Sequence, residues 1–166
     1  EAIPRAHYAT AGPAILRDLP QTTVFVAGLG TGGTPTGTGR YLKEHQPGVK
    51  IIAAAPHPGD LVQGLRALED GFIPPIFDES VLDGKIVVDS KSSFAMSKDL
   101  TQREGLFVGI SCGAVVRAAL KAADRLEGEQ HIVCLLADGG WKYLSSNLWT
   151  TDWEDQPEDV ESKIWW

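Results

Sequence analysis

The sequence predicts an α/β fold of three layers, with a mainly parallel sheet and helices on both of its faces. Two observations predict it. Short apolar runs alternate along the chain with longer stretches of helical character, which is typical of stacked βα units. A glycine-rich segment, GLGTGGTPTGTG at 28–39, directly follows the first apolar run. The 166 residues, 43% of them hydrophobic, are enough for one ordinary core.

The expected strands are the apolar runs in chain order. They are TVFVA at 23–27, KIIAA at 50–54, KIVV at 85–88, LFVGI at 106–110 and HIVCLLA at 131–137. Helical character is found between them at 36–45, 60–68, 92–104 and 113–126, and a short helix is expected at 12–18. The best supported helix is 113–126, where Val115, Ala118 and Ala122 recur at helical spacing and Gly128 supplies a stop.

Charge divides the chain into two expected parts, a domain at 1–148 and an acidic extension at 149–166 that ends in Trp165-Trp166. The extension holds six acids against Lys163, so it carries −5 of the net charge of −7. Neither part has the basic patch that nucleic-acid binding requires. No apolar run approaches the ~20 residues of a membrane span.

Cysteine and histidine usage narrows the chemistry. Cys112 and Cys134 have no C-x-x-C spacing, which fits a reducing compartment, and we expect a cytoplasmic protein. The four histidines form no metal-ligand spacing, so no metal is expected.

The glycine-rich segment suits some phosphate ligands and not others. A Walker P-loop needs a lysine after its last glycine, and none stands there. A dinucleotide site needs an acid after the second strand, roughly 20 residues beyond the loop. The second run is followed by Ala55-Pro56-His57-Pro58, and the first acid is Asp60. Both interpretations therefore lose their support.

A cradle for a single phosphate group remains. Its glycines would let backbone N–H groups approach an anion, and its threonines would offer hydroxyls. Its residues are Gly30, Thr31, Gly32, Gly33 and Thr34. Thr34 before Pro35 resembles a helix N-cap and first helical residue. The alternative, that glycines here only permit close helix packing, fits Gly37 and Gly39 well and stays open for the others.

Five stretches together carry a family resemblance: HYATAGPAIL, FVAGLGTGGTPTGTGRYLKE, DGFIPPIFD, EGLFVGISCGAVVRAAL and DGGWKYLSSNLW. With them the chain resembles the C-terminal half of the cysteine synthase family, pyridoxal-phosphate enzymes of fold type II. The resemblance implies that the loop 30–34 grips the cofactor phosphate. It also implies that Ser111, in GISCGA, meets the pyridine nitrogen.

Two features qualify the role of Ser111. Many family members carry a serine near the position of Asp138 as the pyridine partner, and here an aspartate stands there. The structural alternative for Ser111 is a cap of the helix at 113–126. Ser111 is nevertheless the residue that we expect to contact the pyridine, because a neutral hydroxyl leaves the ring unprotonated and favours elimination over transamination.

The segment GLRALEDGFIP bears on the choice of substrate. Its Arg66 resembles the arginine of actinobacterial-type enzymes that use O-phosphoserine. A guanidinium offers paired donors to a phosphate. The alternative is a surface arginine on the helix 60–68 that pairs with Glu69 or Asp70.

The family's Schiff-base lysine and its Asn-containing substrate loop have no counterpart in the sequence, and the only methionine is Met96. We therefore expect that this chain alone does not catalyse β-replacement and supplies part of a cysteine-forming enzyme. O-Phosphoserine or O-acetylserine would be the substrate. Sulfide, thiosulfate or a carrier-protein thiocarboxylate would be the sulfur donor. The resemblance favours a homodimer. The alternative function is a catalytically incomplete module that binds a phosphate ligand or a partner.

Overall fold

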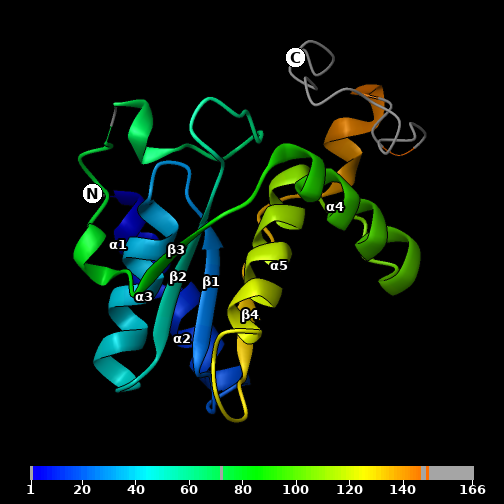
Figure 1. Cartoon of the computed structure of the whole chain (residues 1–166). Helices are drawn as coiled ribbons and strands as arrows, with labels where there is room; N and C mark the ends of the chain where they lie inside the picture. The colour runs from blue at the N-terminus through cyan, green and yellow to red at the C-terminus, as the bar shows by residue number, and fades with distance from the viewer. Residues whose placement is uncertain (1, 72, 147–148, 150–166) are drawn as a thin grey trace.

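The computed structural model describes residues 2–71, 73–146 and 149, which build a parallel sheet between two helical layers (Figure 1). The strands are β1 (Val24–Gly28), β2 (Lys50–Ala55), β3 (Gly84–Val87) and β4 (Ile132–Cys134). Their order is β3-β2-β1-β4, and each neighbouring pair is parallel. The predicted fold class is confirmed.

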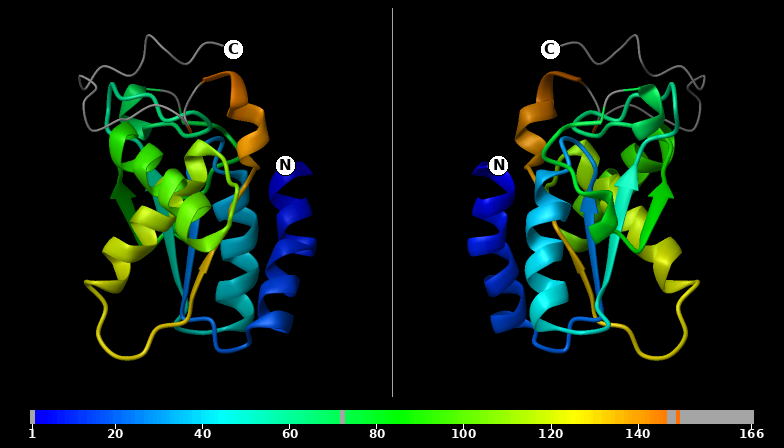
Figure 2. Two further views of the ribbon diagram at one scale, coloured as in Figure 1. Left: turned by 90° about the vertical axis from the view of Figure 1, so that its right-hand side faces the viewer. Right: turned by 90° about the vertical axis from the view of Figure 1, so that its left-hand side faces the viewer.

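Helices cover both faces of the sheet (Figure 2). One face carries α1 (Ala2–Ala9), α2 (Ala11–Asp18) and α3 (Gly33–His45). The other carries α4 (Ser90–Glu104) and α5 (Ile110–Ala123). No helix in the part of the chain that the structure describes is long and apolar enough to cross a membrane.

The alternation of side chains along β1 shows why the sheet needs both layers. Val24 and Val26 pack into a core shared with α5, whereas Phe25 and Ala27 pack into a second core shared with α3. All four are fully buried. A central parallel strand is therefore apolar on both faces, as its sequence is.

The expected strand at 106–110 is wrong. Val108 makes only an isolated antiparallel bridge with Gly139, and Ile110 is already the first residue of α5. Leu106 and Phe107 are exposed, whereas Val108 and Ile110, which lead into that helix, are buried. Apolar character alone did not distinguish a strand from the buried start of a helix.

The expected helix at 60–68 is also wrong. The segment is a loop with a turn at Leu65 and a short 3-10 helix at Leu68–Asp70. Gly59 and Gly64 have φ values of +79° and +88°, which an α-helix does not allow. The Asp60 carboxylate accepts a hydrogen bond from Ser90 N at 2.7 Å, at the start of α4. The segment is thus fixed by contacts distant in sequence.

The remaining differences are one additional helix and one shorter strand. The helix Ala2–Ala9 was not predicted, and Ile132–Cys134 is shorter than the expected strand at 131–137. The other expected strands and helices are found within a few residues. Apart from Trp149, the predicted extension 149–166 lies outside the described residues.

Candidate functional site

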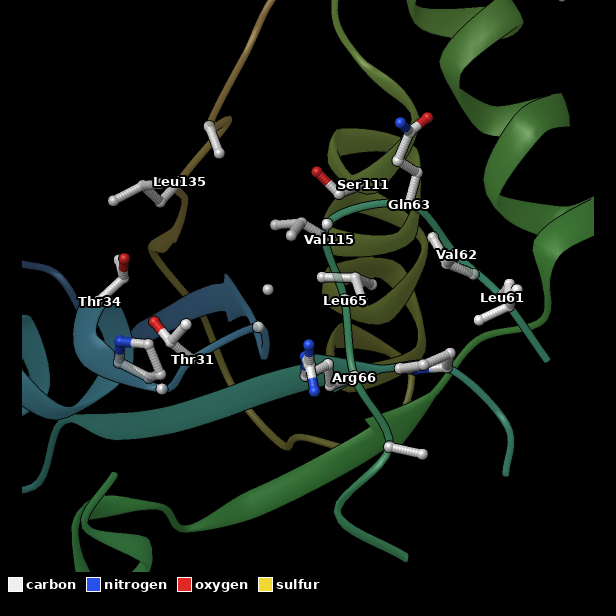
Figure 3. Close-up of a pocket in the computed structure, with 18 of the residues that line it drawn as sticks. Thr31, Thr34, Leu61, Val62, Gln63, Leu65, Arg66, Ser111, Val115 and Leu135 are labelled. Carbon is white, nitrogen blue, oxygen red and sulfur yellow. The ribbon is translucent and has the colours of Figure 1, made fainter. Parts of the chain in front are cut away.

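A cavity of about 810 Å³ opens at the carboxyl ends of β1 and β2. This is the edge of a parallel sheet at which α/β proteins bind ligands. Its walls are the loop after β1, the loop 60–67, the first turns of α5 and the chain after β4 (Figure 3). Every predicted site residue lines it, namely Gly30, Thr31, Gly32, Gly33, Thr34, Arg66 and Ser111.

Helix α3 begins earlier than the sequence suggested. Gly33 is its first residue and Gly32 its N-cap, with a left-handed φ of +80°. Thr34 is therefore not the cap, and Pro35 is the third helical residue, where the missing N–H is still tolerated. Thr36 N closes the first turn on Gly32 O at 3.1 Å. The earlier start brings more of the loop to the positive end of the helix.

The backbone of this loop offers donors without acceptors. Within the described chain, no residue accepts a hydrogen bond from the N–H groups of residues 30–34. Leu29 N, just before them, donates to Ala54 O at 2.8 Å and fixes the loop to β2. Such a run of N–H groups at a helix N-terminus, with the Thr31 and Thr34 hydroxyls beside it, is suited to an anion.

Gly30 and Gly33 permit close packing, as the alternative interpretation expects. A Cβ on Gly30 would lie 2.7 Å from Gly64 O, and one on Gly33 would lie 2.6 Å from the Ile3 side chain. The packing role predicted for Gly37 and Gly39 is confirmed. A Cβ on Gly37 would lie 2.1 Å from Pro4 O, and one on Gly39 would meet Val81 and Ile51.

Ser111 is not a helix cap. Helix α5 begins at Ile110 with Gly109 as N-cap, which places Ser111 second in the helix. Its side chain is 8% exposed, and its hydroxyl makes no hydrogen bond to any described residue. Figure 3 shows this hydroxyl turned toward the cavity. A nearly buried hydroxyl facing a cavity is available to a ligand.

Neighbouring serines hold the start of α5 in place. Ser93 Oγ in α4 donates to Ile110 O at 2.6 Å, and Ser97 Oγ donates to Gly109 O at 3.1 Å. Gly113 lets the two helices approach, because a Cβ there would lie 2.0 Å from Ser93 O. The Ser93 and Ser97 hydroxyls are structural, in contrast to that of Ser111.

Asp138 lies outside the cavity lining, among protein partners of its own. Its carboxylate accepts a hydrogen bond from the Tyr143 hydroxyl at 2.6 Å, and its backbone oxygen accepts one from Gly109 N at 3.0 Å. Lys142 Nζ lies 3.7 Å from the same carboxylate. Burial and the hydrogen bond to Asp138 raise the pKa of Tyr143, which keeps its hydroxyl protonated. Asp138 thus stabilises the turn before α5 through its contact with Gly109.

Arg66 is on a loop that is tied to the cradle. Its backbone N donates to Leu29 O at 2.7 Å, and Gly64 in the same loop lies against Gly30. Of the two acids considered as surface partners, Glu69 pairs with Lys85, and the side chain of Asp70 is not described. Figure 3 shows Arg66, Thr31 and Ser111 on different sides of the cavity.

Sequence reasoning missed three contributors to this region. Gly64, with its positive φ, approaches within 3.6 Å of Ser111, measured from an ideal Cβ. Gln63 lines the cavity and has a buried side-chain oxygen without a partner in the described chain. His7 Nε2 lies 3.0 Å from Thr34 Oγ1. The first two stand beside Arg66 in sequence, which is the signal that could have found them.

Comparisons with known proteins identify the family of the chain. Residues 1–138 match the family model "Pyridoxal-phosphate dependent enzyme". The chain belongs to this family, whose cofactor is pyridoxal phosphate. Among its relatives are a probable cysteine synthase of Bacillus subtilis, 38% identical over 90% of this chain, and a cysteine synthase of Staphylococcus aureus, 34% identical over 91%. The alignments cover 51% and 52% of those proteins, so the chain spans about half their length.

Solved structures match as well. O-Ureido-L-serine synthase, in a variant bound to O-ureido-L-serine, superposes with a TM-score of 0.83 at 32% identity, over 95% of this chain and 52% of that one. The O-acetylserine-dependent cystathionine β-synthase of Helicobacter pylori gives 0.79 at 36% identity, over 86% and 49%. In both superpositions the chain spans about half the length of the matched structure.

Proposed function

We propose that the chain is the phosphate-binding part of a pyridoxal-phosphate-dependent β-replacement enzyme that makes L-cysteine from O-phosphoserine or O-acetylserine. The observation that carries the proposal is the joint placement of three donors at one cavity. These are the unpaired N–H groups of residues 30–34, the Ser111 hydroxyl and the Arg66 guanidinium.

The cradle fits the cofactor phosphate. Its N–H groups and the hydroxyls of Thr31 and Thr34 would hold the phosphate oxygens, while the start of α3 supplies partial positive charge. When bound, pyridoxal phosphate supplies the electron sink that makes replacement at the β-carbon of an amino acid feasible. The protein residues bind and orient it.

Ser111 is the proposed partner of the pyridine nitrogen, in preference to Asp138. The Ser111 hydroxyl is turned to the cavity without a protein partner, whereas the Asp138 carboxylate receives the Tyr143 hydroxyl. A neutral hydroxyl donates to an unprotonated ring nitrogen. That choice of partner suits elimination followed by addition of a sulfur nucleophile.

Arg66 is the proposed residue for the substrate phosphate, which would make O-phosphoserine the preferred substrate. Its loop is fixed to the cradle through Leu29 O, and its side chain lines the same cavity. A guanidinium can give a phosphate two parallel, charge-assisted hydrogen bonds, which a neutral acetyl group receives less well.

The lysine that forms the Schiff base must come from outside this part of the molecule. No lysine lines the cavity in the described residues, and Lys163 lies beyond them. We therefore propose that the chain alone binds the cofactor without catalysing β-replacement. The same fact favours the second candidate, a module that binds a phosphate ligand with an inherited cradle.

Pyridoxal phosphate binding with borohydride trapping tests the first proposal. The chain is titrated with pyridoxal phosphate, reduced with borohydride and weighed by intact mass spectrometry, while cysteine formation is assayed with either serine ester and sulfide. We expect saturable binding, no stoichiometric lysine adduct and no cysteine. Absence of binding, or cysteine formation by the chain alone, contradicts the proposal.

A comparison of ligands separates the two candidates. In an enzyme part, Ser111→Ala weakens binding of pyridoxal phosphate but not of inorganic phosphate; in a simple phosphate module, it weakens neither. A homodimer, a cytoplasmic location and a sulfide, thiosulfate or thiocarboxylate donor belong to the first proposal and rest on the family resemblance.

A further inference from the structure

A histidine outside the cavity touches the cradle. Nε2 of His7, in α1, lies 3.0 Å from Oγ1 of Thr34, and this contact is partly buried. His7 is not among the residues that line the cavity, whereas Thr34 is. The two residues are 27 positions apart in the sequence, so the fold alone brings them together.

Helix α1 is held firmly against the start of α3. Ile3 packs on Gly33, and the Pro4 carbonyl packs on Gly37, so closely that neither glycine has room for a Cβ. His7 is one turn beyond Ile3, which places it on the same side of α1. It also lies in the last turn of α1.

The direction of the hydrogen bond decides what Thr34 can offer an anion. If Nε2 carries the proton, His7 donates to Thr34 Oγ1, and the threonine hydrogen remains available to a phosphate oxygen. If Nε2 is bare, Thr34 donates to His7 and turns only lone pairs to the anion, which repels it. An anion in the cradle therefore favours the protonated Nε2.

We propose that His7 is a positioning residue of the cradle, which donates from Nε2 to Thr34 Oγ1 and thereby directs the Thr34 hydroxyl hydrogen to the bound phosphate group. This inference rests on the proposed function of the cradle. It assigns to α1 a part in cofactor binding that its position outside the cavity does not reveal.

Affinity measurements on variants of the chain test this role with pyridoxal phosphate and inorganic phosphate as probes. His7→Ala is expected to raise both Kd values about 5-fold, as for one lost hydrogen bond. His7→Gln, whose amide N–H can replace Nε2–H, should recover most of the affinity. The control His45→Ala removes a histidine at the far end of α3, about 17 Å along the helix from Thr34, and should leave both Kd values unchanged.

A double-mutant cycle isolates the path through Thr34. In a Thr34→Val background, His7→Ala should change the Kd for phosphate less than 2-fold, because no hydroxyl remains to be oriented. An undiminished 5-fold loss in that background overturns the proposal, since His7 would then act independently of Thr34.

Long-range ¹H–¹⁵N NMR of the wild-type chain reads the proton directly and does not depend on the folding of a variant. With phosphate bound, we expect His7 Nε2 to carry a proton; a bare Nε2 overturns the inference. If wild-type chain binds neither probe, the proposed function fails and the inference with it. If it binds both and His7→Ala binds equally well, only the inference fails.

Discussion

Replacing Ser111 with alanine tests whether its hydroxyl contributes to ligand binding or to the stability of the fold. The Ser111 hydroxyl has no hydrogen-bond partner in the described chain, so its removal leaves no protein group unsatisfied. We expect the free energy of unfolding to change by less than about 0.5 kcal/mol. The Kd for pyridoxal phosphate should rise about 5-fold, which corresponds to about 1 kcal/mol for one lost hydrogen bond.

Ser93→Ala is the matched control, because this serine is also buried and lies against the same turn of α5. Its hydroxyl donates to Ile110 O at 2.6 Å, so its loss should lower the free energy of unfolding by about 1 to 2 kcal/mol. Urea denaturation measures stability, and quenching of tryptophan fluorescence by the cofactor measures affinity. If Ser111→Ala is as destabilising as Ser93→Ala and leaves the Kd unchanged, the reasoning about Ser111 is refuted.

Three further predictions concern the substrate, the packing of α1 and pH. In an enzyme that contains both halves, Arg66→Ala should lower kcat/KM for O-phosphoserine roughly 10- to 100-fold, as expected for a lost charge-assisted hydrogen bond. The kcat/KM for O-acetylserine should fall far less. Equal losses for the two substrates would contradict this assignment. Gly37→Ala should destabilise the chain by about 2 kcal/mol or more in urea denaturation, because the new Cβ would lie 2.1 Å from Pro4 O. Gly84→Ala is the control: its new Cβ would have nothing within 4 Å, so the free energy of unfolding should be nearly unchanged. Burial raises the pKa of Cys134 from 9.0 to about 11, so the unfolded thiol ionises first and stability should fall by about 2 kcal/mol between pH 9 and 11. Denaturation of Cys134→Ala over the same pH range should lack this part of the decrease.

The sequence predicted the fold class because the relevant signals are local. An apolar strand such as Val24–Gly28 must be covered on both faces, and the helices that cover it have their own periodicity. A helix was wrongly predicted for the segment 60–68 because Val62 and Leu65 have helical spacing. Its conformation depends instead on Gly64 at positive φ and on the bond from Asp60 to the start of α4, which joins residues 30 positions apart.

The candidate site divides in the same way. The cradle and Ser111 belong to contiguous motifs, and their common cavity follows from the parallel sheet. The contacts of His7 with Thr34, and of Asp138 with Tyr143 and Gly109, depend on how separate segments pack. The sequence favoured Ser111 over Asp138 as the pyridine partner, but it could not show that Asp138 accepts the Tyr143 hydroxyl, because that contact depends on packing.

Amide chemical shifts during a titration with pyridoxal phosphate test the central claim most directly. The account predicts that the backbone N–H signals of residues 30–34 shift most, as each gains an anionic acceptor, and that the Ser111 region shifts as well. Pyridoxal, which lacks the phosphate, should leave the signals of residues 30–34 nearly unchanged at the same concentration. If the largest shifts occur away from the cradle, or if pyridoxal and its phosphate give the same pattern, the cradle does not hold the cofactor phosphate.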